Sequence, residues 1–424
     1  MKFFKGFFLA SFLFAAALGA EEVLTLEKCI KLAFEGSDLI KIAAGNVAVA
    51  EGLKKEAFGN FLPEVTAWGT YTRLDHVPGI AGFKMGDEDN YAAKMTLKQP
   101  IFTWGKIHQG WRLAGFKWSI SRAEKSAAEK DLLMNVKKTF YTVLLSGEMK
   151  EIAQESYNVI KKHYEVSRAL YEAGKVSSID VSRVKVEMVN RECALIKAEN
   201  EWCIAGKALL NLINYKPAAE WKAGGTLEEC RAVATGELPE LLERAFSSRP
   251  ELAKAEGEEN AGKSFLKIAR SENKPNLVFA GNYEYSNPYN FEKLWDKSWN
   301  VAVSLNFTFF NGLSNRGRIN QAEARMEQII CSRRMLENNI KLEVEKAFLK
   351  RENALRRVDA QKENVGAAKQ NLEIVQARYA QGLVSDIELR DAELALSNSQ
   401  MEYSTAFFDL NTAQAELDRA SGKE

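Results

Sequence analysis

A turn of eleven residues occurs twice in this chain and constrains its fold more than any other feature. The copies begin at Tyr171 and Tyr379 and end at Val181 and Leu389, and together they divide the 424-residue chain into two similar halves. Each copy follows one helical pattern and precedes another. We therefore expect each turn to be the tip of a helical hairpin.

The residue types within each turn fit such a tip. A glycine suits the left-handed position that closes a helix, and a serine and a carboxylate three residues apart can form a capping box for the next helix. These residues are Gly174, Ser177 and Asp180 in the first turn and Gly382, Ser385 and Glu388 in the second. The tips themselves are apolar, with Val176 in one and Leu383 and Val384 in the other.

Composition excludes several function classes. Lys and Arg total 58 against 57 for Asp and Glu, so there is no basic field that would attract nucleic acid. The sequence contains no nucleophile–base pair, no phosphate loop and no metal-ligand spacing. We therefore expect a protein that is not an enzyme and that has no cofactor. The five cysteines form no disulfide pattern, and we expect most of them to be small buried hydrophobes: Cys29, Cys193, Cys203, Cys230 and Cys331.

The first twenty residues are typical of a secretory signal peptide. Two lysines precede an apolar run, and small residues follow it, which predicts cleavage before Glu21. The apolar run is short for a membrane-spanning helix.

After the signal peptide the same plan is written twice. Residues 21–214 form a first repeat: a helix over 24–61, strands over 64–72 and 91–102, a long helix to Ala173, the turn, and a helix over 178–214. Residues 238–424 form a second: helices, strands over 276–286 and 299–309, a long helix, the turn, and a helix to Ala420. Residues 215–237 carry a proline and three glycines and are interpreted as a connector.

The last helix has a heptad seam typical of an antiparallel coiled coil. Large residues recur every seven positions, as do small ones: Leu389, Leu396, Tyr403, Leu410 and Leu417, with Ala392, Ser399, Ala406, Ala413 and Ala420. The first repeat has Val181, Met188, Leu195, Trp202 and Leu209 in the same spacing.

The four strands alternate between apolar and polar side chains, with aromatic residues near their ends. Strands of about ten residues match the length of a transmembrane β-strand. A sheet packed on the helices of a soluble protein is the alternative. In a membrane four strands cannot close a barrel, for which about eight are needed, so the chain would have to share a barrel with other copies.

The mature chain resembles the TolC-like family of outer-membrane efflux proteins over residues 22–421. The two turns, the Leu62–Pro63 and Lys274–Pro275 starts of strands, and the segments 101–105 and 309–312 carry the resemblance. It implies a mostly α fold with a small β part: duplicated coiled-coil hairpins that form a periplasmic tunnel, and four strands per chain in a 12-stranded barrel shared by a homotrimer. The connector would surround the middle of the tunnel.

The resemblance also implies a function and site residues. The chain would be the passive exit duct of a tripartite efflux or type I secretion system, located in outer-membrane lipid and coupled through a periplasmic adaptor to an inner-membrane pump. By motif position Tyr379 and Asp180 would be partners in a periplasmic gate, with Glu388 and Asp391 as an acidic ring that favours cations. Capping alone also explains Asp180 and Glu388. Val384 stands where the family member compared has an arginine, so part of that lock is missing.

The tips of the turns would dock on the adaptor. The residues that the resemblance assigns to this surface are Gly174, Lys175, Val176 and Ser177, with Gly382, Leu383, Val384 and Ser385. A periplasmic coiled-coil adaptor, or a structural protein without a pore, is the alternative function, but an adaptor would have one hairpin flanked by β-rich domains.

Overall fold

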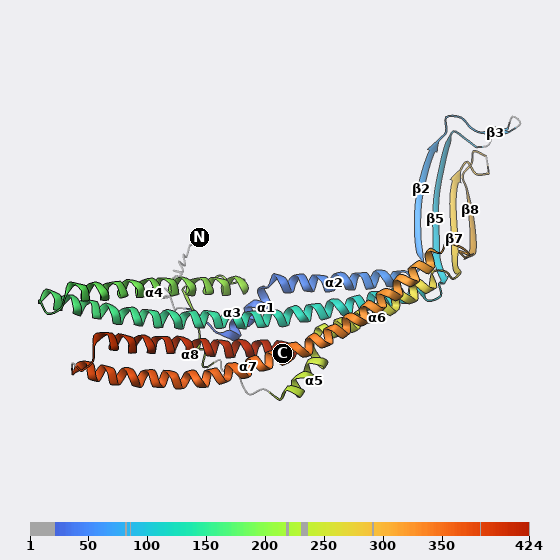
Figure 1. The fold of residues 1–424 in the computed structure, drawn as a ribbon. Helices are drawn as coiled ribbons and strands as arrows, with labels where there is room; N and C mark the ends of the chain where they lie inside the picture. Colours follow the sequence, from blue (N-terminus) through green and yellow to red (C-terminus); the bar gives the residue numbers. More distant parts are fainter. Residues whose placement is uncertain are drawn as a thin grey trace, which may run out of the picture. The chain divides into compact units, whose positions relative to one another are not determined.

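The computed structural model describes residues 22–80, 83–84, 86–217, 220–229, 236–290, 292–381 and 383–423 (Figure 1). The chain is mostly helical with a small β part, as expected, and the described strands form one four-stranded sheet and two pairs. The first half contains β1 (Glu22–Leu24), α1 (Leu26–Gly36), α2 (Asp38–Gly59), β2 (Glu64–Arg73), β3 (Gly79–Ile80), β4 (Phe83–Lys84), β5 (Asp89–Phe102), α3 (Lys106–Glu172) and α4 (Ser178–Leu212). The second half contains β6 (Trp221–Ala223), α5 (Leu238–Ser248), α6 (Pro250–Ser271), β7 (Asn276–Asn287), β8 (Asp296–Asn306), α7 (Ser314–Ala380) and α8 (Asp386–Ala420).

The duplication extends to element lengths. Helices α3 and α7 have 67 residues each, and α4 and α8 have 35 each. The contacts between residues divide the chain into two compact units, and each unit contains segments from both sequence repeats. One unit holds residues 1–37, 131–237 and 345–419, and the other holds 38–130, 238–344 and 420–424. No described helix has a segment that is both apolar and long enough to cross a membrane.

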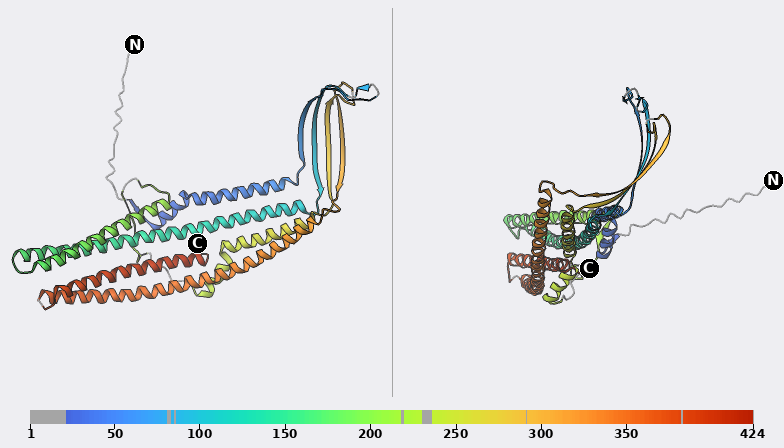
Figure 2. Two further views of the ribbon diagram at one scale, coloured as in Figure 1. Left: turned by 45° about the horizontal axis from the view of Figure 1, so that its top comes forward. Right: turned by 90° about the vertical axis from the view of Figure 1, so that its right-hand side faces the viewer.

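The first unit contains the ends of both hairpins, α3–α4 and α7–α8 (Figure 2). The heptad seam of α8 is its core, because Leu410 and Leu417 are fully buried and Leu389 is nearly so. The four small seam residues of this unit, from Ala392 to Ala413, are buried as well. In α4 the seam is only partly covered: Leu195 and Leu209 are buried, whereas Trp202 is exposed.

The prediction of a single helix over 24–61 is wrong, because the structure has β1, α1 and α2 there. Leu24 belongs to β1, and the helix breaks at Ser37, whose backbone is extended with φ −65° and ψ 119°. The side-chain amide of Asn214 donates to the carbonyl oxygen of Gly36 at 3.3 Å, which satisfies a group that the break releases. The second repeat breaks at the matching place, Arg249, because a residue before proline avoids the helical conformation.

Strand β1 pairs in parallel with β6, so the start of the described chain is attached to the connector. The carboxylate of Glu22 accepts a hydrogen bond from Lys28 Nζ at 2.6 Å and another from the Tyr215 hydroxyl at 2.9 Å. This pairing was absent from the sequence-based prediction, because neither three-residue segment has a periodic pattern.

The second unit contains an antiparallel sheet in the order β2-β5-β7-β8 (Figure 1). Strands β2, β5 and β7 cover the segments where strands are predicted. Strand β8 is displaced from its predicted segment, because it begins at Asp296 and ends at Asn306 rather than at residue 309. Asn306 pairs with Asn276, the first residue of β7, so the residues beyond it have no strand to pair with.

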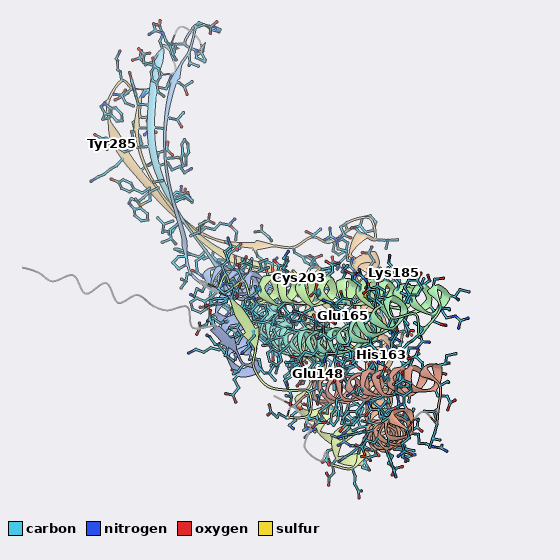
Figure 3. All side chains as sticks on the ribbon, turned by 90° about the vertical axis from the view of Figure 1, so that its left-hand side faces the viewer. Glu148, His163, Glu165, Lys185, Cys203 and Tyr285 are labelled. Carbon is cyan, nitrogen blue, oxygen red and sulfur yellow. The ribbon has the colours of Figure 1, made fainter. Side chains whose placement is uncertain are left out.

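The prediction that most cysteines are buried is wrong. Cys29 is fully buried, and burial raises the pKa of its thiol to about 11, which keeps it protonated. Cys193, Cys203 and Cys331 are exposed, because they lie on helix faces away from the buried positions. Figure 3 labels Cys203. These four cysteines are free thiols, and Cys230 lies outside the described residues.

Candidate functional site

The first hairpin tip closes α3 as the sequence predicts. Gly174 has φ +70°, in the left-handed region that glycine adopts without strain. Its N–H donates to the carbonyl oxygen of Tyr171 at 2.8 Å, and the Lys175 N–H donates to that of Leu170 at 2.9 Å. This pair of bonds is the Schellman motif, which satisfies the free carbonyl groups at the end of the helix.

The capping box that opens α4 is also confirmed. The Asp180 N–H donates to Ser177 Oγ at 3.3 Å, and the Ser177 N–H donates to Asp180 Oδ2 at 3.2 Å. The Ser177 hydroxyl donates to the same Oδ2 at 2.7 Å. The hydroxyl and backbone bonds from Ser177 favour the charged carboxylate and so lower the pKa of Asp180.

The second tip repeats this geometry. The Leu383 N–H donates to the carbonyl oxygen of Arg378 at 3.0 Å, which matches the bond from Lys175 in the first tip. The Glu388 N–H donates to Ser385 Oγ at 3.3 Å, and the Ser385 hydroxyl donates to Glu388 Oε1 at 3.2 Å. The predicted helix-closing residue Gly382 lies outside the described residues.

Both tips present apolar side chains to solvent. Leu383 is 64% exposed, and Ile179 and Ile387, in the first turns of α4 and α8, are also exposed. Val176 and Val384 are half-buried. Exposed apolar side chains that lie together on a surface are common in protein-binding sites. The tips are therefore a candidate docking site.

The four predicted gate residues lie close to the tips but are not joined to one another within the chain. Tyr379 is 40% exposed at the end of α7, and Asp180, Glu388 and Asp391 are exposed. Among the described residues, none of these four forms a hydrogen bond or ion pair with another of them.

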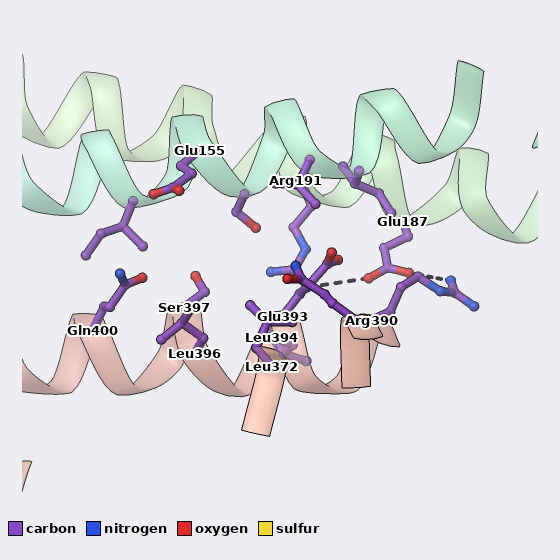
Figure 4. A pocket seen from close by; sticks show the side chains of 15 residues that line it. Glu155, Glu187, Arg191, Leu372, Arg390, Glu393, Leu394, Leu396, Ser397 and Gln400 are labelled. Atoms are coloured by element: carbon purple, nitrogen blue, oxygen red, sulfur yellow. Dashed lines mark hydrogen bonds and ion pairs between the residues drawn. The ribbon is translucent and has the colours of Figure 1, made fainter. Parts of the chain in front are cut away.

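A group of charged residues that the sequence analysis missed does join the two hairpins. We call it the inter-hairpin cluster, and Figure 4 shows most of it between α4 and α8. Its members are His163 of α3, Glu187 and Arg191 of α4, and Asp386, Arg390 and Glu393 of α8.

Arg390 is the centre of the inter-hairpin cluster. Its Nη1 donates to Glu187 Oε2 at 2.7 Å, across the two hairpins, and its Nε lies 3.0 Å from Asp386 Oδ2 one helical turn away. The Arg390 side chain is only 14% exposed. A charge-assisted hydrogen bond at a partly buried site is stronger than an ion pair on the surface. Each such bond stabilises the fold by about 1.5–3 kcal/mol.

His163 makes the second link between hairpins. Its Nε2 lies 3.3 Å from Glu393 Oε1, and its Nδ1 lies 4.0 Å from Asp386 Oδ1. The hydrogen bond with Glu393 raises the pKa of His163, against partial burial and the nearby Arg390 guanidinium, which lower it. The imidazolium form is therefore the one that this site favours.

A cavity of about 170 Å³ lies beside these links and is lined by all four helices of the hairpins (Figure 4). Apolar side chains such as Ile160, Leu372 and Leu394 contribute to its walls together with Glu187 and Arg390. The helices here are not packed as closely as in a protein core, because a space remains between their side chains.

The sheet of the second unit has one apolar and one polar face. Directly opposed residues of antiparallel strands share a face, so the register defines both. The apolar face carries Val65 and Tyr71 of β2, Tyr91, Met95 and Leu97 of β5, Tyr283 and Tyr285 of β7, and Trp299, Val301, Val303 and Leu305 of β8. Figure 3 labels Tyr285 on this sheet. The polar face carries Thr66, Thr70, Lys94, Thr96, Lys98, Asn282, Glu284, Ser298 and Asn300.

The apolar face is uncovered in the chain, since Trp299 is 73% exposed and the other large residues of β8 are exposed too. Aromatic rings cluster near one end of the sheet, where Tyr285 and Trp295 stack with centroids 5.0 Å apart and Tyr71 and Tyr91 are equally close. Phe102 and Trp104 pair near the other end, at 5.1 Å. On the polar face the Asn282 side chain bonds Thr96 and Asn300, both at 2.9 Å.

The chain combines long helical hairpins with a sheet that has one apolar and one polar face. This combination is typical of one class of outer-membrane protein. The model of the family described as "outer membrane efflux protein" matches residues 29–215 and 241–423. The chain belongs to this family, and its location is the outer membrane.

Relatives and solved structures agree with this assignment. The probable outer membrane lipoprotein SilC of Salmonella typhimurium is 24% identical, over 79% of this chain and 74% of its own. The cobalt-zinc-cadmium resistance protein CzcC of Cupriavidus metallidurans is 21% identical, over 72% and 71%. The crystal structure of the CmeC outer membrane channel of Campylobacter jejuni superposes with a TM-score of 0.83, at 17% identity, over 94% of this chain and 85% of its own.

Proposed function

We propose that this protein is the passive exit channel of a tripartite efflux or type I secretion system. The observation that carries the proposal is the sheet with two unlike faces. A large exposed apolar face needs lipid to cover it, and a face of Thr, Asn, Lys and Glu needs water. Together these requirements describe the wall of a water-filled pore.

A complete pore requires several copies of the chain. Strands β2 and β8 end the strand order, and their outer edges carry backbone groups that lipid cannot satisfy. Pairing β8 of one copy with β2 of the next removes both edges. In the homotrimer that the family resemblance implies, three copies contribute a 12-stranded barrel.

Purified protein reconstituted in planar lipid bilayers tests this function. We expect extraction to require detergent, chemical cross-linking to give a trimer, and the bilayers to show discrete conductance steps. A monomer that stays in the aqueous periplasmic fraction and gives no conductance would overturn the proposal.

The channel in this proposal is gated at the hairpin ends, by Tyr379, Asp180, Glu388 and Asp391. Both bonds that Asp180 accepts from Ser177 use Oδ2, so Oδ1 is available to a donor such as the Tyr379 hydroxyl of an adjacent hairpin. Capping and gating are therefore compatible in one residue.

We infer that Arg390 supplies the link between hairpins that is missing at Val384. The bond from Arg390 to Glu187 joins α8 to α4 near the tips, and opening of the gate by movement of α7–α8 would break it. The adjacent cavity supports such a movement, because helices that already enclose free volume can shift with little repacking.

Two variants test the gate in the same bilayers. Replacing both Glu388 and Asp391 by alanine is expected to weaken block by a trivalent cation such as hexamminecobalt(III). Arg390→Ala is expected to raise the resting conductance, whereas Lys197→Ala, which removes an exposed cation from α4, is expected to leave it unchanged. Unchanged block and unchanged conductance would remove these residues from the gate.

The partners in this proposal are a periplasmic adaptor and, through it, an inner-membrane pump. Apolar docking at the tips is supported by the exposed Leu383 and Ile387, and the residues assigned to it are 174–177 and 382–385.

A further inference from the structure

One large aromatic side chain lies on the wrong face of the sheet for contact with lipid. Trp68 is mid-strand in β2, between Ala67 and Gly69, which belong to the apolar face. Its directly opposed residue in β5 is Lys94, and Lys94 in turn opposes Glu284 of β7. The rung formed by Trp68, Lys94 and Glu284 therefore crosses the polar face.

The position of Trp68 differs from that of the aromatic residues near the ends of the sheet. Those rings contact one another, whereas the described ring contacts of Trp68 consist of the Lys94 ammonium, 5.8 Å from the centroid. Trp68 is 49% exposed, so it is not buried in a core. Neither anchoring at a membrane interface nor core packing explains a tryptophan at this place.

The chemistry of the rung suits one kind of ligand. An exposed indole offers a flat face for stacking, and a lysine over that face shows that it also accepts a cation. Glu284 stands opposite Lys94, so a solute that displaces the ammonium from the ring leaves it beside a carboxylate. Pairing of the displaced ammonium with this carboxylate would lower the cost of the exchange.

We propose that Trp68, with Lys94 and Glu284, forms a binding site for planar aromatic solutes inside the channel. The inference rests on the proposed function, because it takes the polar face as the wall of the lumen. Each copy of the chain contributes one such rung at the same height, so a solute leaving the pore passes a ring of indole faces.

Block of single-channel current by ethidium, a planar aromatic cation, tests the site. Trp68→Ala is expected to raise the half-blocking concentration about five- to tenfold, the loss of one aromatic stacking contact of roughly 1–1.4 kcal/mol. Trp68→Phe, which keeps an aromatic face, is expected to retain most of the block. Tetrapropylammonium, a cation without an aromatic ring, can contact the indole only as a cation and cannot stack on it. It is therefore expected to lose less block than ethidium in Trp68→Ala.

Trp299→Ala is the matched control, because it removes a tryptophan from the apolar face of the same sheet. Block that is equal in the wild type, Trp68→Ala and Trp299→Ala would overturn the inference while leaving the channel proposal intact. A wild-type protein without conductance would instead overturn the channel proposal. If Trp68→Ala fails to assemble, the test rests on Trp68→Phe. A Trp68→Phe channel that keeps its tetrapropylammonium block but loses its ethidium block would overturn the stacking role, because phenylalanine keeps an aromatic face.

Discussion

His163 gives the contact between the two hairpins a dependence on pH. It faces Asp386, Arg390 and Glu393 of α8, and the Glu187–Arg191 pair of α4 lies in the same cluster. Because the pKa of His163 is raised in the folded state, its stabilising contribution is complete below its ordinary pKa. The contribution is lost as the pH rises through the raised value.

We predict that the start of α8 opens more readily at pH 8 than at pH 5.5. Hydrogen exchange of amides 386–393, corrected for intrinsic rates, measures this opening. His163→Gln should remove most of the pH dependence, and His76→Gln, which changes an exposed histidine near the sheet, should preserve it. Equal protection of wild type and His163→Gln at both pH values would contradict the prediction.

At the scale of elements, the hairpin tips combine rigid backbone with apolar surface. The Schellman bonds and the capping box order the backbone of the first tip in the absence of a partner. A partner that docks on a preordered surface loses less conformational entropy on binding.

We predict that Leu383→Asp weakens binding of the periplasmic adaptor proposed above without destabilising the chain. Leu383 is exposed and its backbone bond to Arg378 does not depend on its side chain, so folding should change by less than about 0.5 kcal/mol. Surface plasmon resonance with the adaptor and thermal unfolding measure the two effects. Ile374→Asp, on an exposed position of α7 away from the tip, is the control. Adaptor affinity equal to that of wild type would remove the tip from the interface.

At the scale of the whole molecule, the apolar and polar faces of the sheet determine how stable the protein is in a membrane. Val301 lies mid-strand on the apolar face of β8, and its neighbour Ala302 lies on the other face. We predict that Val301→Lys destabilises the membrane-inserted protein by about 2–4 kcal/mol, the cost of a lysine near the bilayer midplane. Ala302→Lys should cost far less, since its ammonium reaches water.

Refolding into phospholipid vesicles, followed by urea titration, compares these two variants. The same midpoint for Val301→Lys and Ala302→Lys would mean that the two faces do not meet different solvents.

The parts of the fold that are local in sequence could be predicted, and those that are distant could not. Gly174, Ser177 and Asp180 each bond to a partner three residues away, so their local pattern predicts the turn and its caps. Arg390 and Glu187 are about two hundred positions apart, and nothing in their local context marks them as partners. Trp68 fits an aromatic strand composition, and only the register with Lys94 shows which face it occupies.

Strand β1 has consequences for how the chain is made. Its partner β6 begins at Trp221, so roughly half of the polypeptide must be synthesised and exported before Glu22–Leu24 can pair. Contacts of such long sequence separation form late. During biogenesis Glu22–Leu24 therefore stays without its strand partner until the connector has been synthesised.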